Sequence, residues 1–310
     1  MKGGSATFGT GNYSFNVGCI AGTTGVYYQT GGSVTQANYG YIGVRTNVSG
    51  RMELYGGQFK AIQRYYQGVD GGYGYLLIDS GLGGTPATNN YTFYPDSYRM
   101  GSGALNPDVI NVTELKSGIF WGHDQGTFLV GYDGNGRFIQ TGGALHLDNR
   151  ADMNIGTNTG TGYFEISGTS YLYVGRILYV GGGSSTSAIF KVRGSNLTLL
   201  KFGYEQGNTD VVFRAGGTLS LEFDAGGIKT MDVKNDAQFD AGSLLYCTAN
   251  GTPEGTYTVL TVTNAGDQIW NYGLAFTPGM PNTNWWSFEF LAQQLRVTYS
   301  PKEGTVFFAQ

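Results

Sequence analysis

The feature that most constrains this chain is a glycine that recurs every 25 residues, usually after an apolar residue. The spacing holds in two runs of three: Gly18, Gly43 and Gly68, then Gly131, Gly156 and Gly181. Each of these glycines leads through a turn of small residues to a short alternating stretch and then to another glycine. The chain is therefore an array of similar segments, and any fold proposed for it must repeat with this period.

The stretches between the glycines have the pattern of short β-strands. They alternate Tyr, Val, Ile and Phe with polar residues, and Gly, Asn, Ser and Thr bound them. A repeat of 25 residues is shorter than a propeller blade of about 40 and lacks helical or leucine-rich patterns. The sequence predicts an all-β fold, a single right-handed parallel β-solenoid (β-helix) of roughly nine to eleven coils. Corner glycines would supply positive φ angles or let neighbouring backbones approach closely.

Composition agrees with a packed repeat protein. Gly accounts for 53 of 310 residues, and charged residues make up 13%, about half the usual ~25%. An aromatic content of 15% provides ample apolar surface to bury, which excludes a disordered chain. The net charge of −4 is small and no basic stripe is present, so nucleic acid is not an expected partner.

The two cysteines, Cys19 and Cys247, lie many coils apart in such an array, too far for a disulfide. We expect both to be small buried residues. No run of 18 apolar residues exists, so no transmembrane helix is expected. The first residues contain no apolar signal segment.

The pattern divides the chain into three parts. Residues 1–17 are predicted to form an N-terminal cap or entry coil, 18–255 the solenoid, and 256–310 a C-terminal β cap. Within the solenoid, residues 82–112 contain three of the seven prolines and no regular alternation, which predicts an irregular excursion from one corner.

Candidate binding residues come from the excursion and the tail, because loops on a solenoid usually carry binding. The candidates are aromatic or cationic: Tyr91, Phe93, Tyr94, Tyr98, Arg99, Trp270, Trp285 and Trp286. The alternative is that the aromatic residues of the excursion pack against the flank of the solenoid, as in Ω-type loops.

One group of residues could support acid–base chemistry. His123 lies one 25-residue period before Asp148, with Arg150 close in sequence, and a histidine beside a carboxylate can act as acid and base. The same spacing places Trp121 one coil before His146. Ladders of paired side chains on a solvated face explain these residues equally well, so no catalytic residue is assigned.

No metal or cofactor site is expected. Asp232, Asp236 and Asp240 are spaced by four, but the nonapeptide repeat of calcium β-rolls is missing. The Asp133–Gly136 stretch does not continue into an EF-hand loop. Phosphate-binding loops, nucleophile elbows and zinc-binding motifs are also missing.

The phrase V-G-x-x-G-x-G-x-Φ-x-Q-T-G-G, with Φ apolar, runs from Val130 to Gly143 and is echoed from Val17 to Gly32. It resembles the repeats of secreted β-solenoid proteins of the autotransporter-passenger and PEP-CTERM-sorted type, over roughly residues 10–255. The resemblance implies a long parallel β-helix displayed outside the cell. It transfers no catalytic residue, because that repeat is structural.

These observations favour an extracellular or cell-surface structural or adhesive protein that is not an enzyme. The chain has few ionisable side chains that could transfer protons in catalysis. Its repeated Tyr, Asn, Gln and Thr residues suit contacts with glycans or with other copies of the chain. Surface or matrix glycans and self-association, into filaments or a surface layer, are the expected partners. The alternative is a polysaccharide-binding or polysaccharide-degrading β-helix, either a lyase or a hydrolase.

Overall fold

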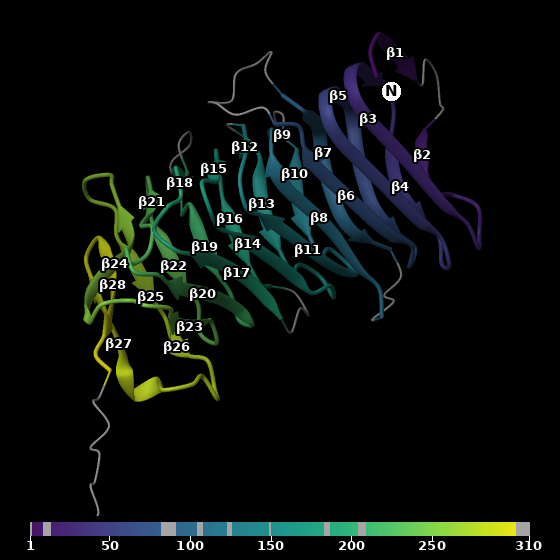
Figure 1. Ribbon diagram of the computed structural model, residues 1–310. Helices are drawn as coiled ribbons and strands as arrows, with labels where there is room; N and C mark the ends of the chain where they lie inside the picture. Colours follow the sequence, from purple (N-terminus) through teal and green to yellow (C-terminus); the bar gives the residue numbers. More distant parts are fainter. Residues whose placement is uncertain are drawn as a thin grey trace, which may run out of the picture.

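The structure is a computed structural model that describes residues 2–8, 14–81, 91–103, 108–122, 126–148, 150–182, 187–203 and 209–301. In these residues the fold is all-β, with one single-turn 3-10 helix, η1 (Thr283–Trp285). It is a parallel β-solenoid of about nine coils, as the sequence predicts. The coils stack from the N-terminal strands at one end of the molecule to β24–β28 at the other (Figure 1).

Three columns of hydrogen-bonded strands form the faces of the solenoid, here called A, B and C. Face A contains β2 (Phe15–Val17), β4 (Gly40–Val44), the end of β5 (Ser49–Val69), most of β7 (Phe93–Ser102), β10 (Thr127–Val130), β13 (Asp152–Ile155), β16 (Leu178–Val180), β19 (Val211–Phe213), β22 (Ala237–Phe239) and β25 (Ile269–Asn271).

Face B contains the first half of β3 (Thr24–Gln36), the start of β5, β6 (Tyr73–Asp79), β8 (Ile110–Ser117), β11 (Asn135–Gln140), β14 (Gly162–Ile166), β17 (Ala188–Arg193), β20 (Gly217–Phe223), β23 (Leu244–Ala249) and β26 (Ala275–Phe276).

Face C contains β1 (Ser5–Phe8), the end of β3, the middle of β5, the start of β7, β9 (Ile119–Gly122), β12 (Ala144–Leu147), β15 (Tyr171–Val174), β18 (Leu199–Phe202), β21 (Met231–Val233) and β24 (Gly255–Val262). Two antiparallel strands, β27 (Trp286–Leu291) and β28 (Gln294–Tyr299), follow and pair with each other, and β28 also pairs with β24.

The recurring glycines occupy one corner, where face A turns into face B. Gly131 has φ +72°, and a Cβ placed on it would lie 2.0 Å from the carbonyl oxygen of Thr161 in the next coil. Only glycine combines this left-handed conformation with such a close approach between coils. The 25-residue spacing follows, because Thr127 pairs with Asp152 one coil later.

Inward-facing side chains fill the solenoid with stacked rings. On face B, Phe138 lies 5.1 Å from Phe164, which lies 5.6 Å from Phe190, with nearly parallel rings. All three are fully buried. Burying one such ring stabilises the fold by roughly 1.5–3 kcal/mol. Period-2 alternation turns the residues beside them outwards.

The degenerate repeat at Gln67-Gly68 has a structural explanation. Gln67 is fully buried where other coils have an apolar residue. Its amide nitrogen donates to the carbonyl oxygens of Gly74 at 2.7 Å and Val112 at 2.6 Å, while its oxygen accepts from Tyr98 and Thr113. These bonds satisfy a polar group that would otherwise be costly to bury.

The structure corrects the predicted boundaries. Most of the described part of 82–112 is not an irregular excursion, because β7 and the start of β8 run in the parallel faces; residues 82–90 and 104–107 lie outside the described residues. Parallel pairing also continues past residue 256 to Phe276, so the separate cap is the β27–β28 hairpin. At the other end, β1 and β2 already belong to faces C and A.

The prediction for the cysteines is half right. Both are free, and Cys247 is buried in β23, where burial raises the pKa of its thiol. Cys19 is exposed, because it lies in the turn that follows β2 and does not face the core.

Candidate functional site

Face B carries two depressions on its outer surface. The larger has a volume of about 600 Å³ and lies where the strands of face B begin, with Asn135, Arg137, Tyr163, Ser187 and Ile189 among its lining residues. The smaller has a volume of about 250 Å³ and lies where the strands end. Together the two depressions make face B the candidate site.

Strand register builds the larger depression. Arg137 pairs with Tyr163, which pairs with Ile189, so three successive coils place these side chains in one outward column. The guanidinium of Arg137 lies 5.0 Å from the centre of the Tyr163 ring. The buried phenylalanine column directly beneath fixes these residues as outward-facing.

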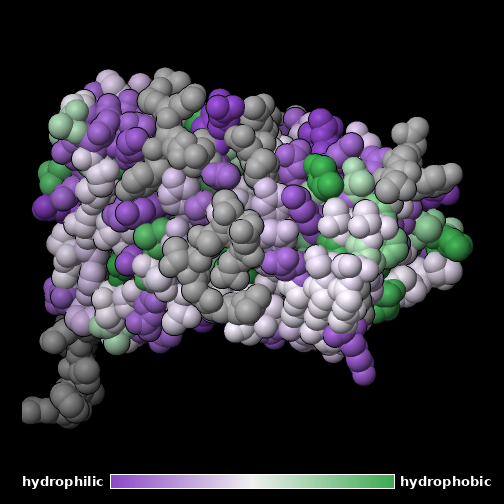
Figure 2. Space-filling view, turned by 90° about the horizontal axis from the view of Figure 1, so that it is seen from above, coloured by the Kyte–Doolittle hydropathy of each residue, from purple (hydrophilic) through white to green (hydrophobic). Residues whose placement is uncertain are grey.

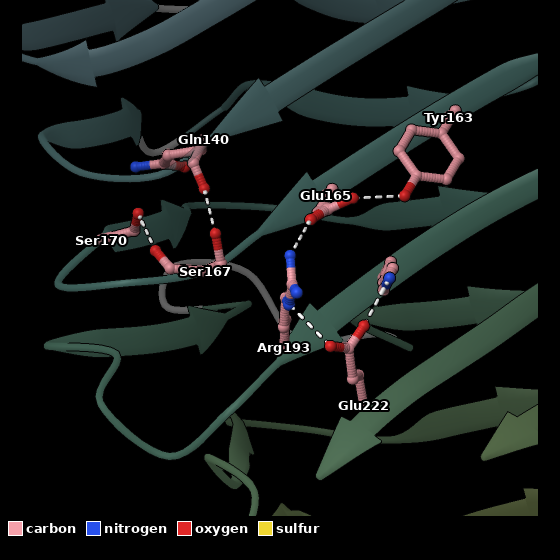
Figure 3. A network of polar contacts seen from close by, with 8 residues as sticks. Gln140, Tyr163, Glu165, Ser167, Ser170, Arg193 and Glu222 are labelled. Atoms are coloured by element: carbon pink, nitrogen blue, oxygen red, sulfur yellow. Dashed lines mark hydrogen bonds and ion pairs between the residues drawn. The ribbon is translucent and has the colours of Figure 1, made fainter. Parts of the chain in front are cut away.

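A chain of polar contacts crosses the middle of the face (Figure 3). The hydroxyl of Tyr163 donates to Glu165, and Nη1 of Arg193 lies 3.6 Å from Oε1 of the same carboxylate. Nε of Arg193 donates to Oε1 of Glu222 at 2.7 Å. Nζ of Lys191 lies 2.7 Å from Oε2 of Glu222. The chain of contacts therefore links β14, β17 and β20.

Local charges set the ionisation of this network. Partial burial opposes ionisation of Glu222, but its hydrogen bonds and ion pairs with Lys191 and Arg193 dominate and lower its pKa. Burial, followed by the hydrogen bond to Glu165, raises the pKa of Tyr163. At neutral pH Glu222 is an ion-paired carboxylate and Tyr163 is a hydrogen-bond donor.

The smaller depression continues from this network to the corner between faces B and C. It is lined by Arg193, Glu222, Asp224 and Asn250, among others. Asp224 accepts hydrogen bonds from Oγ of Ser195 at 2.9 Å and from the Ser195 backbone at 3.0 Å. Burial opposes ionisation of Asp224, but these hydrogen bonds outweigh it and lower its pKa.

The residues of the predicted excursion do not form one binding cluster. Phe93 and Tyr98 are in the core, 0% and 1% exposed, because β7 turns them inwards. Tyr91 and Tyr94 lie with ring centres 4.8 Å apart against a small apolar cluster on the outside of face C. Arg99 lies on face A, 5.4 Å from the ring of Tyr132.

The three predicted tryptophans also separate. Trp286 is 7% exposed and packs on Phe223 at 5.2 Å, so its ring is part of the packing of the cap. Trp285 is half-buried, 6.4 Å from Tyr299. Trp270 is 39% exposed on face A, with its ring parallel to that of Tyr272 at 6.5 Å.

Of the candidate acid–base group, His123 lies outside the described residues, while Asp148 directly follows β12 and Arg150 lies two residues further along the chain. The register prediction for its neighbours is confirmed: Trp121 pairs with His146. His146 packs between Trp121, whose ring is tilted, and Tyr173, whose ring is stacked on it, with ring centres 4.6 Å away on each side. Burial lowers the pKa of His146, although the charge of Asp148 opposes this shift. His146 thus belongs to a side-chain ladder.

Sequence reasoning missed Tyr163, Glu165, Arg193 and Glu222 as a group. The sequence did carry a signal for them. The strands around these residues alternate core residues with charged ones, and the same alternation recurs one coil later. The lengths of the intervening turns hide it, since Arg193 and Glu222 are 29 residues apart and not 25.

No protein-family model matches the chain, and neither a curated protein nor a solved structure matches it. In the described residues, no group of three or more His, Cys, Asp or Glu side chains is placed to hold a metal ion. The described part of the chain also has no helix long and apolar enough to cross a membrane.

Proposed function

We propose that this protein is an adhesive β-solenoid that binds a glycan chain along the outer surface of face B and does not cleave it. The observation that carries the proposal is the pair of depressions on one face, joined by the network from Tyr163 to Glu222. A polymer lying across successive coils would contact both.

The lining of the site suits a polyhydroxylated ligand. Asn135, Thr161 and Ser187 offer neutral donors and acceptors, Arg137 a charged donor, and Ile189 an apolar surface in the larger depression. Binding sites of this kind combine apolar surface with a few placed polar groups. Cations and carboxylates are nearly balanced along the network, which favours an uncharged or weakly charged glycan over a strongly acidic one.

Binding without cleavage is favoured by the state of the carboxylates. Glycosidases need one carboxyl group whose pKa is raised, so that it can protonate the leaving oxygen. Here the ion pairs with Lys191 and Arg193 lower the pKa of Glu222 and hold it ionised. An ionised Glu222 cannot protonate a leaving oxygen, so we place a polysaccharide lyase or hydrolase second to binding without cleavage.

An extracellular or cell-surface location belongs to the same proposal. It is supported by the low charge content, the glycine-rich repeat and the resemblance of that repeat to secreted solenoids. The surface shown in Figure 2 agrees with exposure to a polar medium, because its hydrophobic residues are scattered among hydrophilic and neutral ones.

Binding to a glycan array, followed by calorimetry on the strongest ligand, tests the proposal. Tyr163→Ala should weaken binding at least about tenfold, since it removes a ring and a hydroxyl from the larger depression. Tyr75→Ala is the matched control, because Tyr75 lies three coils before Tyr163 on face B, with Arg51 over its ring at 4.9 Å in the same cation–π arrangement. It should bind like the wild type.

Two results would contradict the proposal. One is no binding to neutral or acidic glycans, and the other is equal loss in both variants. Incubating the protein with the polysaccharide that it binds distinguishes cleavage from binding alone. Release of product that disappears in Glu222→Gln or His123→Ala would establish an enzyme.

A further inference from the structure

The outward side chains of face A include a column of aromatic and cationic residues that the proposed function does not use. Tyr41 of β4 pairs with Tyr66 of β5, which pairs with Arg99 of β7, so three successive coils place these residues in one column. Their neighbours along each strand are buried, which turns the three side chains outwards. Further along the same face, β16 contributes Tyr179 and β25 contributes Trp270.

The first part of this column is an aromatic platform, defined here as Tyr39, Tyr41 and Tyr66. The rings of Tyr41 and Tyr66 are stacked, with their centres 5.3 Å apart and an angle of 11° between their planes. The ring of Tyr39 lies 6.4 Å from that of Tyr41 and 6.2 Å from that of Tyr66. Burial, followed by the charges of Tyr66 and Tyr39, raises the pKa of Tyr41, so its hydroxyl stays protonated at neutral pH. The platform therefore offers flat rings together with hydroxyl groups.

Arg99 lies one coil beyond the platform, and its guanidinium lies over two tyrosine rings. The central carbon of the guanidinium is 5.8 Å from the centre of the Tyr66 ring, in the coil before, and 5.4 Å from that of Tyr132, in the turn after β10. Contacts of this kind orient the planar group and attract its charge to the ring faces. Arg99 is half-buried, so it is partly removed from water as well.

The charge of Arg99 is not matched by a carboxylate. Two other arginines show the contrast: Arg176 lies 3.4 Å from Asp152 on the same face, and Arg193 lies 2.7 Å from Glu222 on face B. Within the part of the chain that the structure describes, Arg99 forms neither an ion pair nor a side-chain hydrogen bond, and its Nε is buried without a partner. A partly desolvated cation without a partner costs free energy, and a bound anion would reduce this cost.

A second cation repeats this arrangement on the same face. Arg214 directly follows β19, and its guanidinium lies 4.5 Å from the centre of the Tyr179 ring in the preceding coil. Among the described residues Arg214 also forms no ion pair. Arg99 and Arg214 are four coils apart, or about 19 Å at a rise of about 4.8 Å per coil. Two separate cations on one face suit a chain with repeated negative charges better than a single small anion.

We propose that face A is a second binding surface, which binds an acidic glycan through Arg99 and the aromatic platform. The planar fork of an arginine matches the two oxygens of a carboxylate. Tyrosine rings offer a flat apolar surface with a polar hydroxyl at its edge, which suits the C–H face and the hydroxyl groups of a sugar ring. A neutral chain would leave Arg99 unpaired, so charge complementarity selects a glycan whose rings carry carboxylates. This goes beyond the proposed function, which places a neutral or weakly charged glycan on face B.

Calorimetry on the full chain tests this inference with three probes: an oligomer of galacturonic acid, the neutral oligomer of galactose of the same length, and free acetate. The acidic oligomer should bind more tightly than acetate, and added salt should weaken its binding because opposite charges meet. Arg99→Met keeps a long apolar side chain but removes the charge, so it should weaken binding of the acidic oligomer at least about tenfold. Arg99→Lys keeps the charge without the planar fork and should restore only part of the affinity.

Arg51→Met is the matched control, because Arg51 also lies over a tyrosine ring, 4.9 Å from the centre of Tyr75, but is paired with Glu53 on face B. It changes the net charge equally and should bind the acidic oligomer like the wild type. Tyr163→Ala should also bind this oligomer normally, while Arg99→Met should bind neutral glycans normally. Failure of this inference is thereby distinguished from failure of the proposed function.

Four results would overturn the inference. The first is a wild type that does not bind the acidic oligomer, and the second is free acetate binding as tightly as the oligomer. The third is an equal loss in Arg99→Met and Arg51→Met, which would show attraction by net charge alone. The fourth is a loss in Tyr163→Ala in place of Arg99→Met, which would put the acidic oligomer on face B. Circular dichroism checks that each variant is folded.

Discussion

Individual glycines determine how closely successive coils of this solenoid approach. Seven occupy the corner between faces A and B among the described residues, with φ between +63° and +83°: Gly18, Gly43, Gly68, Gly101, Gly131, Gly156 and Gly181. At Gly18, Gly43 and Gly131 two physical demands meet, a left-handed backbone and a carbonyl oxygen of the next coil within 2.4 Å of an added Cβ. The two demands can be separated by mutation.

Gly131→Ala should be much more destabilising than Gly22→Ala. Both positions have positive φ, which costs a side chain about 1–2 kcal/mol. At Gly22 an added Cβ meets nothing within 4 Å, whereas at Gly131 it would lie 2.0 Å from the Thr161 oxygen. Urea denaturation should show the larger loss of unfolding free energy at Gly131. Similar losses at the two positions would contradict the role given to close approach.

A buried carboxyl group gives the fold a pH dependence at the same scale. Asp210 is 1% exposed just before β19, and its two oxygens accept bonds from the backbone and side-chain nitrogens of Asn235, at 2.6 and 3.2 Å. Burial raises its pKa to about 7, although these bonds oppose the shift. The folded protein therefore favours the protonated form of Asp210 more than the unfolded chain does.

The sign of the effect follows from this raised pKa. Stability from Asp210 is fully present below the unfolded pKa of about 3.9 and is lost as pH rises through about 7. The wild type should thus lose on the order of 4 kcal/mol between pH 4 and pH 8 relative to Asp210→Asn. Parallel stability curves for the two proteins, measured by denaturation across this range, would refute the assignment.

Among the elements, the ladders were predictable and one long strand was not. Coil spacing alone placed Trp121 beside His146, and their ring centres lie 4.6 Å apart. β7 escaped prediction because it turns a corner between faces C and A, which interrupts the period-2 alternation near Pro95. The search for period-2 alternation of apolar and polar residues recognises only straight strands, so it misses a strand that bends at a corner.

The β27–β28 hairpin is the element that closes the C-terminal end, so its buried tryptophan should matter more than the exposed one. Trp286→Ala removes a ring packed on Phe223 and should cost about 3 kcal/mol of unfolding free energy. Trp270→Ala, at 39% exposure, should change stability little. Thermal denaturation of both variants checks this. A larger effect at Trp270 would show that the cap is misassigned.

At the scale of the whole molecule, the sequence alone determined the all-β class, the parallel solenoid and its 25-residue coil. These follow from local chemistry, because stacked coils impose the same turn, glycine and alternation on every repeat. The tertiary structure alone decided which residues share face B. Tyr163, Glu165, Arg193 and Glu222 meet because turns of unequal length still return the strands to one register. It also decided that Phe93, Tyr98 and Trp286 are buried. The sequence alone does not distinguish an aromatic residue that faces the core from one on the outer side of a strand.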